Sequence, residues 1–310
     1  VAIKEFMPQG MATRNEDYTL QSVSEAEDSV CNLEWGLERF IREARTLCKF
    51  NHPNIVRVHT VFETNNTAYM VMSYEKGISF SERLKKGQPS EEELTDMVLG
   101  LLDGLDGMHA EGFIHRDIKP GNIFIRADGT ALLLDFGSAR QAIGEATMTL
   151  TKVASPGYAP FEQYYGRSDM QGPWTDIYDL GATLYRAITG EAPTDATFRN
   201  RTSGEEAIQE IMDVLDRHSD KYSPFLLRAV EHAIRTNHKD RPQTVDEWRT
   251  MLSDPNLSTA TQWRYAVNSF KKKSANKREK KKRIHWKDYL VFGSLTIALA
   301  VLIYTYLQNS

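Results

Sequence analysis

The sequence is poor in cysteine and lacks the glycine patterns that bind nucleotide phosphates. Its two cysteines, Cys31 and Cys48, form no CxxC pair, which excludes a cysteine zinc site or a disulfide framework and favours a reducing compartment. No two glycines stand two residues apart, and there is no Walker A motif. The chain therefore contains neither a G-x-G loop nor a P-loop.

Charge of either sign is present but unevenly distributed. The 310 residues are 41% hydrophobic and 26% charged, which excludes a wholly disordered or collagen-like chain. The formal net charge is −4, yet residues 271–283 alone carry +8, so the remainder of the chain carries −12. An acidic body with one short basic segment indicates a local anchor and no nucleic-acid-binding domain.

An uncharged segment near the C-terminus predicts a membrane helix. Tyr289–Leu307 has 19 residues without a charge, which as a helix is about 28 Å long and matches a hydrocarbon core of roughly 30 Å. We expect a basic linker at 253–288, the span at 289–307 and a short tail at 308–310. The basic side stays in the cytoplasm, which predicts a single-pass protein of the plasma (inner) membrane with its large domain cytoplasmic.

Two features of this segment have alternative interpretations. The apolar run could instead be a buried helix that ends a soluble domain. The basic run 271–283 could be a solvated linker, a nuclear signal, a topology determinant or a patch for anionic lipid, and the adjacent apolar span favours the last.

The first 75 residues have a β-rich pattern with one helix. Asn65 and Asn66 separate two strands, as expected for a tight hairpin, because asparagine tolerates positive φ. Pro53 ends the preceding amphipathic helix. Residues 7–32 are polar, and we expect an irregular insertion of unknown role there. The strands are expected at 1–6, 55–62 and 68–74, and the helix between 33 and 50.

Beyond Glu75 the pattern becomes helical. Ser90-x-x-Glu93 predicts a capping box that opens a long helix, and an Asp128-Gly129 turn predicts a short hairpin. Gly190 is placed to end a strongly apolar helix. The helices are expected at 91–111, 176–189, 224–235 and 245–252, and the hairpin strands at 123–125 and 131–134.

Three motifs occur together and in order. Residues 115–122 read H-R-D-x-x-x-x-N, Asp135-Phe136-Gly137 follows 13 residues after Asn122, and residues 1–4 read V-A-I-K. Each belongs to the signature set of protein kinases. The chain resembles the eukaryotic-like (Hanks-type) Ser/Thr protein kinases, especially bacterial membrane-anchored ones, over about residues 1–252.

The resemblance implies a role for each polar residue of these motifs. Asp117 accepts the proton of the attacking hydroxyl, and Lys119 points at the transferring phosphate. Asn122 and Asp135 are oxygen ligands of Mg²⁺. Lys4 pairs with the α- and β-phosphates of ATP. A helix carboxylate holds Lys4, with Glu43 as the candidate and Glu34 and Glu38 as alternatives.

Further matching segments imply the adenine site and the control of activity. Ala2 and Phe124 sandwich the adenine, Met72 is the gatekeeper, and Tyr74 lies in the hinge. His115 and Phe136 stack, and Glu162 and Arg241 form a buried structural ion pair. Ser155 stands where the family usually has threonine. Arg116 implies control by phosphorylation of the activation loop, at Thr147, Thr149 or Thr151.

The implied fold is α+β with two lobes: a partial small lobe at 1–75 that lacks its first strands, and a helical lobe at 76–252. We expect the Gly-rich loop to precede Val1, so that the chain is truncated at its N-terminal side. The gap between Lys4 and Glu43 is long for the family.

Three functions are consistent with the sequence, and they follow in order of decreasing support. The first is a Ser/Thr kinase that transfers the γ-phosphate of ATP, with Mg²⁺, to protein substrates. The second is a membrane-tethered pseudokinase that acts as a scaffold, which the intact Lys4, Asp117 and Asp135 oppose. The third is a small-molecule phosphotransferase, which the complete activation segment opposes. The sequence pattern identifies neither the substrate protein nor the activating signal. A homodimer is an open alternative.

Overall fold

The computed structural model describes residues 1–24, 26–135, 140–141, 155–164, 168–201 and 204–253. The predicted stack of His115 on Phe136 and the three threonines of the activation loop lie outside the described residues, as do the basic run 271–283 and the apolar run 289–307. Among the helices that the structure does describe, none is long and apolar enough to span a bilayer.

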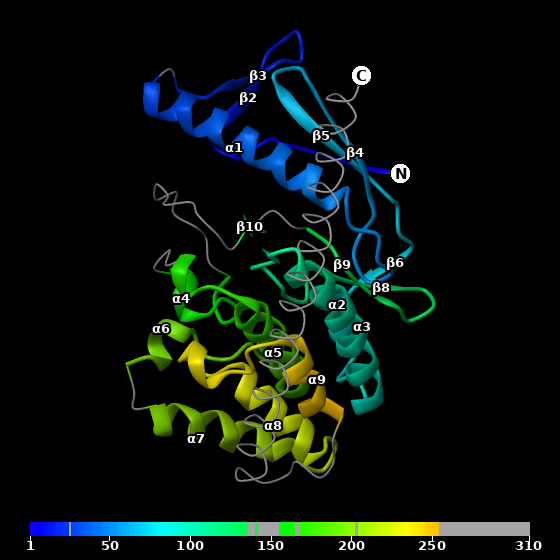
Figure 1. The fold of residues 1–310 in the computed structure, drawn as a ribbon, viewed down its shortest axis with the longest axis vertical. Coiled ribbons are helices and arrows are strands. Elements are labelled where there is room, and N and C mark those ends of the chain that lie inside the picture. The colour runs from blue at the N-terminus through cyan, green and yellow to red at the C-terminus, as the bar shows by residue number, and fades with distance from the viewer. Residues whose placement is uncertain (25, 136–139, 142–154, 165–167, 202–203, 254–310) are drawn as a thin grey trace, which may run out of the picture. The chain divides into compact units, whose positions relative to one another are not determined.

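The first lobe is built on a small antiparallel sheet with the order β1-β5-β4 (Figure 1). Its strands are β1 (Ala2–Glu5), β4 (Val58–Thr64) and β5 (Thr67–Met72). The turn between β4 and β5 has Asn65 and Asn66 both at φ 55°, as the sequence predicts. The long helix α1 (Glu27–Leu47) packs against β4 and β5.

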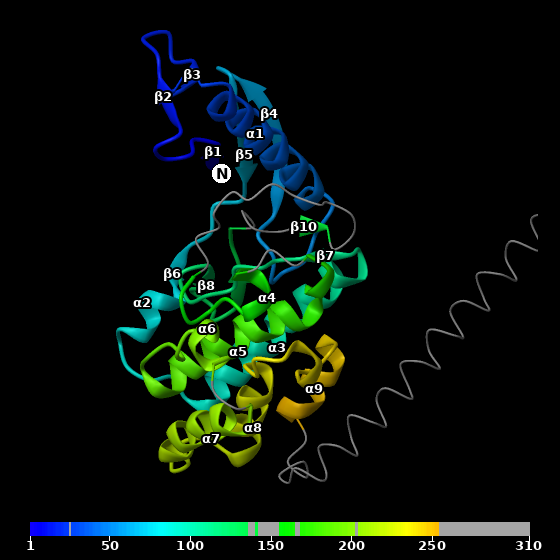
Figure 2. The same cartoon turned by 90° about the vertical axis from the view of Figure 1, so that its left-hand side faces the viewer.

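Part of the expected insertion is regular structure, so the prediction of an irregular segment at 7–32 is wrong. β2 (Ala12–Arg14) and β3 (Leu20–Ser22) form a hairpin, and α1 begins at Glu27. Figure 2 shows this hairpin beside α1, on the side away from the helical lobe. Strands of three residues are too short to show a period of two, and the first turn of α1 is polar.

The second lobe is helical and surrounds α5 (Pro173–Thr189), of which most side chains are buried. Gly190 ends α5 at φ 88°, in the left-handed conformation that glycine adopts at helix C-termini. Figure 1 shows α7, α8 and α9 gathered around α5 at the end of the molecule away from the sheet. The longer helices are α3 (Glu91–Ala110), α7 (Gly204–Leu215), α8 (Pro224–Ala233) and α9 (Val245–Ser253). The short ones are α2 (Phe80–Leu84), α4 (Phe161–Tyr164), α6 (Ala196–Arg199), η1 (Ser168–Met170), η2 (Asp216–His218) and η3 (His238–Asp240).

Only one arm of the predicted capping box at the start of α3 is formed. The Ser90 hydroxyl accepts the backbone N–H of Glu93 at 3.2 Å. The Glu93 carboxylate instead accepts two hydrogen bonds from the Arg83 guanidinium, at 2.7 and 2.6 Å. A bidentate guanidinium is a stronger partner for a carboxylate than one backbone N–H, which explains the difference.

Short strands lie where the two lobes meet. β6 (Gly77–Ser79), β8 (Ile123–Arg126) and β9 (Ala131–Leu133) form one sheet, and β7 (Phe113–Ile114) pairs with β10 (Arg140–Gln141). The backbone N–H of Leu133 donates to the carbonyl of Asn54 at 2.9 Å, and that of Val56 to the carbonyl of Leu133 at 3.0 Å. Residues 55–57 are thus used between the lobes, so β4 begins at Val58 and not at the predicted Ile55.

Candidate active site

The side chain of Asp117 lies at the centre of a polar network in the loop between β7 and β8. The Lys119 ammonium donates to its two carboxylate oxygens at 3.0 and 2.9 Å. The Asn122 amide nitrogen donates to Oδ2 at 2.8 Å. The Ser155 hydroxyl donates to Oδ1 at 3.0 Å and accepts from Lys119 at 2.9 Å. An aspartate that binds a hydroxyl beside an ammonium has the groups of a base positioned for phosphoryl transfer.

Buried acids at the start of α5 accept backbone N–H groups of this loop and so fix its conformation. Asp176 accepts the backbone N–H groups of His115 and Arg116 at 2.9 and 2.8 Å, and its side chain also contacts Nε2 of His109 at 2.7 Å. Burial by itself would raise the pKa of Asp176, but the hydrogen bonds and nearby histidines outweigh burial and lower it. A charged Asp176 therefore fixes the backbone of a loop in which Arg116 has φ 69°.

A second buried acid of α5 has a different electrostatic character. Asp179 accepts the backbone N–H of Ile118 at 3.1 Å through Oδ2. Burial, and then the charge of Asp176, raise the pKa of Asp179 well above its usual value. The raised pKa means that Asp179 resists adding a second negative charge beside Asp176 while it accepts the N–H of the loop.

Lys4 and Asp135 form an ion pair, although they belong to segments far apart in the sequence. The Lys4 ammonium, on β1, forms an ion pair with the carboxylate of Asp135, which follows β9. Asp135 has φ 52°, an uncommon conformation for a residue other than glycine. The structure therefore brings together one predicted phosphate-binding residue and one predicted metal ligand.

Glu43 is not paired with Lys4, so the expected Lys4–Glu43 ion pair is replaced by the Lys4–Asp135 pair among the residues that the structure describes. Glu43 lies on α1 at a small pocket whose other walls include Leu47, Phe50 and Met108. Loss of solvent raises the pKa of Glu43 to about 8, although the charge of Lys4 acts in the opposite direction. The physical reason for the difference is competition, because the Lys4 ammonium is bound by the carboxylate of Asp135 and Glu43 is left in a desolvated position.

The residues predicted for the adenine site are placed on three elements. Ala2 on β1 lies directly opposite Met72 on β5 in the sheet register. Phe124 is on β8, where its ring lies close to the backbone of Gly77. Tyr74 follows β5 with 67% of its surface exposed.

The oxygen donors at Asn122 and Asp135 fit a magnesium ion. The Asn122 amide nitrogen is held by Asp117, which orients the side chain and leaves its carbonyl oxygen as the donor to a ligand. In the described part of the chain no group of three or more His, Cys, Asp or Glu residues could hold a metal ion. One carboxylate and one amide suit Mg²⁺, which usually completes its octahedron with phosphate oxygens and waters.

The predicted structural ion pair between Glu162 and Arg241 is confirmed. The Arg241 guanidinium donates to both Glu162 oxygens, at 2.7 and 3.1 Å, and both side chains are buried. Its remaining donors bind the carbonyls of Arg235 and Thr236. The pair ties α4, at the end of the activation segment, to the segment before α9.

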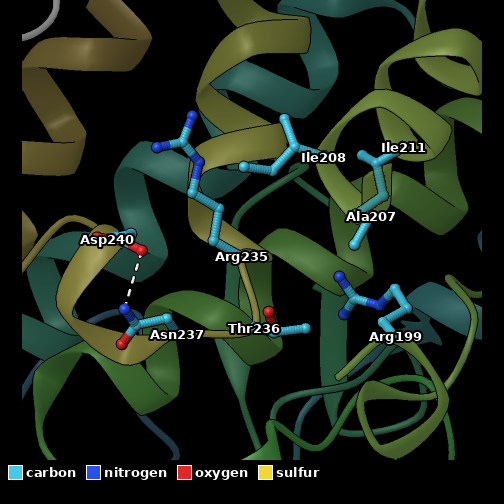
Figure 3. Close-up of a pocket in the computed structure, with 8 residues that line it drawn as sticks. All are labelled: Arg199, Ala207, Ile208, Ile211, Arg235, Thr236, Asn237 and Asp240. Carbon is cyan, nitrogen blue, oxygen red and sulfur yellow. Dashed lines mark hydrogen bonds between the residues drawn. The ribbon is translucent and has the colours of Figure 1, made fainter. Parts of the chain in front are cut away.

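A pocket next to this pair is structural in character (Figure 3). Arg199 at its wall donates to the carbonyls of Thr194 and Ile234 at 2.9 and 2.7 Å. Asn237 donates to Asp240 at 2.9 Å, as Figure 3 shows. The side chains of Arg199, Asn237 and Asp240 are thus engaged by the protein itself, which gives this pocket a structural role.

Sequence reasoning had given no role to Asp176, Asp179 or His109. The available signal was an Asp-x-x-Asp pair in the first turns of an otherwise apolar helix, because buried acids need specific partners. His109 carried no sequence signal that separates it from a surface histidine.

Comparison with known proteins shows the family to which this chain is similar. A family model described as "Protein kinase domain" matches residues 11–255. "Serine/threonine-protein kinase C" of Synechocystis is 32% identical over 218 residues, which cover 67% of this chain and 38% of the relative. "Probable serine/threonine-protein kinase PknB" of Lactococcus lactis is 28% identical over 229 residues, 73% of this chain and 35% of the relative. The chain thus spans little more than a third of these curated relatives.

A solved structure, "PpkA-294 apo form", is similar with a TM-score of 0.68 and 38% identity, and the match covers 81% of this chain and 86% of that one.

Proposed function

The chain belongs to the protein kinase domain family and has its two-lobe fold, and we propose that it transfers the γ-phosphate of ATP to serine or threonine hydroxyls of protein substrates. The observation that carries the proposal is the hydrogen bond from the Ser155 hydroxyl to Asp117, with Lys119 bound to both. It demonstrates that a hydroxyl fits between the candidate base and the candidate cation.

The residues of the network then have separate tasks in phosphoryl transfer. Asp117 orients the substrate hydroxyl and accepts its proton as the new P–O bond forms and the bond from the γ-phosphorus to the leaving ADP breaks. Lys119 neutralises charge on the transferring phosphoryl oxygens, and the oxygen of Asn122 together with Asp135 would hold the magnesium ion. The chemistry that magnesium would supply there is neutralisation of the negative charge on the phosphates.

Lys4 has to change partner for this reaction. In the structure its ammonium is paired with Asp135. With Asp135 engaged as a metal ligand, the Lys4 ammonium would be available to the α- and β-phosphates, and Glu43 is the nearby carboxyl that would hold it. The positive charge of Lys4 favours the ionised form of Glu43, which makes this exchange electrostatically feasible.

Activity is tested by autophosphorylation with labelled ATP and Mg²⁺, using the full reading frame. We expect label on serine or threonine, and a loss of at least about 100-fold in Asp117→Asn, since general-base catalysis contributes about 10²–10⁴-fold. Asp220→Asn, an exposed aspartate after η2, is the matched control and should retain activity. Absence of both label and nucleotide binding would support the scaffold function instead.

Regulation by phosphorylation of Thr147, Thr149 or Thr151 belongs to the same proposal. Its support is the sequence pattern, in which Arg116 precedes the base and a phosphate would provide a partner of opposite charge. A triple Ala variant that retains wild-type activity and wild-type response to prior phosphorylation would contradict it.

Attachment to a membrane is proposed on the sequence of residues 271–307. The 19 uncharged residues suit a single span, and the preceding basic run suits the cytoplasmic face and anionic lipid. Membrane fractionation with carbonate extraction tests the span. Protease protection in inverted vesicles tests the orientation, since a cytoplasmic kinase domain is exposed to protease there.

A further inference from the structure

A polar pocket outside the Asp117 network is lined by α2 and the C-terminal end of α5. Its lining contains two cations and no acid: Ser81, Leu84, Lys85, Gln88, Arg186, Ala187 and Gly190. Neither the ammonium of Lys85 nor the guanidinium of Arg186 forms a hydrogen bond or ion pair within the part of the chain that the structure describes. The pocket therefore has a net positive charge that the protein itself does not neutralise.

A third cation adjoins the pocket. The Lys221 ammonium donates to Oε1 of Gln88 at 2.7 Å. The amide nitrogen of Gln88 in turn donates to the carbonyl of Ile188 at 2.7 Å, which occupies one of the carbonyls at the C-terminal end of α5. Gln88 thus keeps its orientation, and a carboxylate that enters the pocket meets cations on both sides.

Glu82, an acid on the same helix as Lys85 and outside the pocket lining, is engaged by its own helix. Glu82 on α2 caps its own helix, accepting the backbone N–H and the hydroxyl of Ser79 at 2.9 and 3.0 Å. Those hydrogen bonds, and to a smaller degree Lys85, lower the pKa of Glu82. Arg186 also lies in the last turn of α5, where a cation favours the helix dipole, but that interaction leaves its donors available to a ligand.

Both walls of the pocket are connected to the candidate active site. The backbone N–H of Ser81 donates to the carbonyl of Pro120, three residues after Asp117, at 2.9 Å. On the other wall, the charge of Arg186 acts on the phenol of Tyr158. The backbone N–H of Tyr158 donates to the carbonyl of Ser155 at 2.9 Å, and Ser155 is the residue whose hydroxyl binds Asp117. The pocket is thus joined on both sides to segments that carry or contact Asp117.

We propose that Lys85 and Arg186 form a substrate-selecting site that binds an acidic side chain near the phosphorylated serine or threonine, so that the enzyme prefers acidic segments of its protein substrates. The proposal rests on the proposed kinase function and specifies its substrate class. A guanidinium and a carboxylate form a bidentate pair, which gives geometric selection as well as attraction. A basic substrate is disfavoured at the same place by like-charge repulsion.

The test uses serine peptides that differ only in the residues flanking the acceptor: a glutamate series, a glutamine series and a lysine series. Binding is measured first, by fluorescence anisotropy of labelled peptides in which the acceptor serine is alanine, and kcat/KM is then measured on the serine forms. We expect the glutamate series to bind and react about tenfold better than the glutamine series, the equivalent of one close charge pair. The lysine series should be the poorest.

The variants Arg186→Glu and Lys85→Glu should abolish or invert the preference, while KM for ATP stays unchanged. Lys239→Glu is the matched control, because it makes the same change of charge at the exposed η3 segment and does not line the pocket. It should retain the preference for glutamate.

Equal binding of the glutamate and glutamine series by the wild type would overturn the inference. So would an unchanged preference in Arg186→Glu, or an effect of Arg186→Glu on binding to anionic lipid vesicles with none on peptides. If no peptide is phosphorylated at all, the kinase function fails, while the anisotropy measurement still decides whether the pocket selects acidic peptides.

Discussion

The carboxylate of Asp176 accepts the backbone N–H of His115 at 2.9 Å, although 61 residues separate them in the sequence. This contact links the first turn of α5 to the loop that carries Asp117. A buried, charged acceptor at this point sets the backbone of the whole loop.

Removing that acceptor should impair both folding and activity. We expect Asp176→Ala to reduce the free energy of unfolding by about 3–5 kcal/mol, because the buried N–H groups and His109 lose their partner. Phosphoryl transfer should fall by more than the folded fraction does, since Asp117 is no longer held. Urea unfolding and autophosphorylation of the soluble folded fraction measure the two effects. Asp96→Ala, at an exposed position of α3, is the control and should change stability by less than about 0.5 kcal/mol.

Activity should require a hydroxyl at residue 155, and either serine or threonine should be able to supply it. Ser155→Ala removes one hydrogen bond to Asp117 and one to Lys119. We expect kcat to fall by about tenfold or more, corresponding to about 1–2 kcal/mol of lost interaction. Ser155→Thr keeps the hydroxyl and should stay within about threefold of wild type. Equal rates for the Ala and Thr variants would show that the hydroxyl has no part in positioning Asp117.

Glu43 should make the protein less stable as the pH rises. Its pKa is raised to about 8 from 4.5, so the folded state binds a proton that the unfolded state releases between these values. The free energy of unfolding should therefore decrease as pH increases from about 5 to 8. Glu43→Gln mimics the protonated form and should weaken this dependence and be the more stable protein at pH 8. Urea midpoints at pH 5, 6.5 and 8 test this, with Glu38→Gln, on the same helix, as control. A wild-type slope that Glu43→Gln leaves unchanged would assign the effect to another group.

The two arginine–carboxylate pairs of the helical lobe should differ in their contribution to stability. Arg241→Ala leaves Glu162 buried without its guanidinium, so we expect a loss of about 3–5 kcal/mol. Arg249→Ala breaks a pair with Asp103 at 2.7 Å, whose side chain is 57% exposed, and should cost at most about 1 kcal/mol. Thermal unfolding of both variants gives the comparison. Similar losses for the two would contradict the difference in burial as the cause.

Local patterns carried most of the correct predictions. The hairpin at Asn65-Asn66 and the end of α5 at Gly190 were predicted because the backbone conformations they need are properties of single residues. The apolar periodicity of α3 and α8 places these helices to within two residues of their observed ends. The β2–β3 hairpin was not predicted, because its two strands are stabilised by contacts outside them, such as the 2.5 Å pair of Arg14 with Glu5 on β1.

The sequence by itself determined the chemistry of the candidate site. Asp117, Lys119 and Asn122 lie within six residues of one loop, so their types and spacing were sufficient to identify a phosphoryl-transfer motif. Only the tertiary structure decided how that loop is held, through Asp176 and Asp179 of α5, and that Lys4 pairs with Asp135 and not with Glu43. It also placed Arg186 of α5 beside Lys85 of α2, about a hundred residues away in the chain. These choices depend on distance, burial and competing partners, which arise from packing between distant segments and leave no trace in local residue spacing.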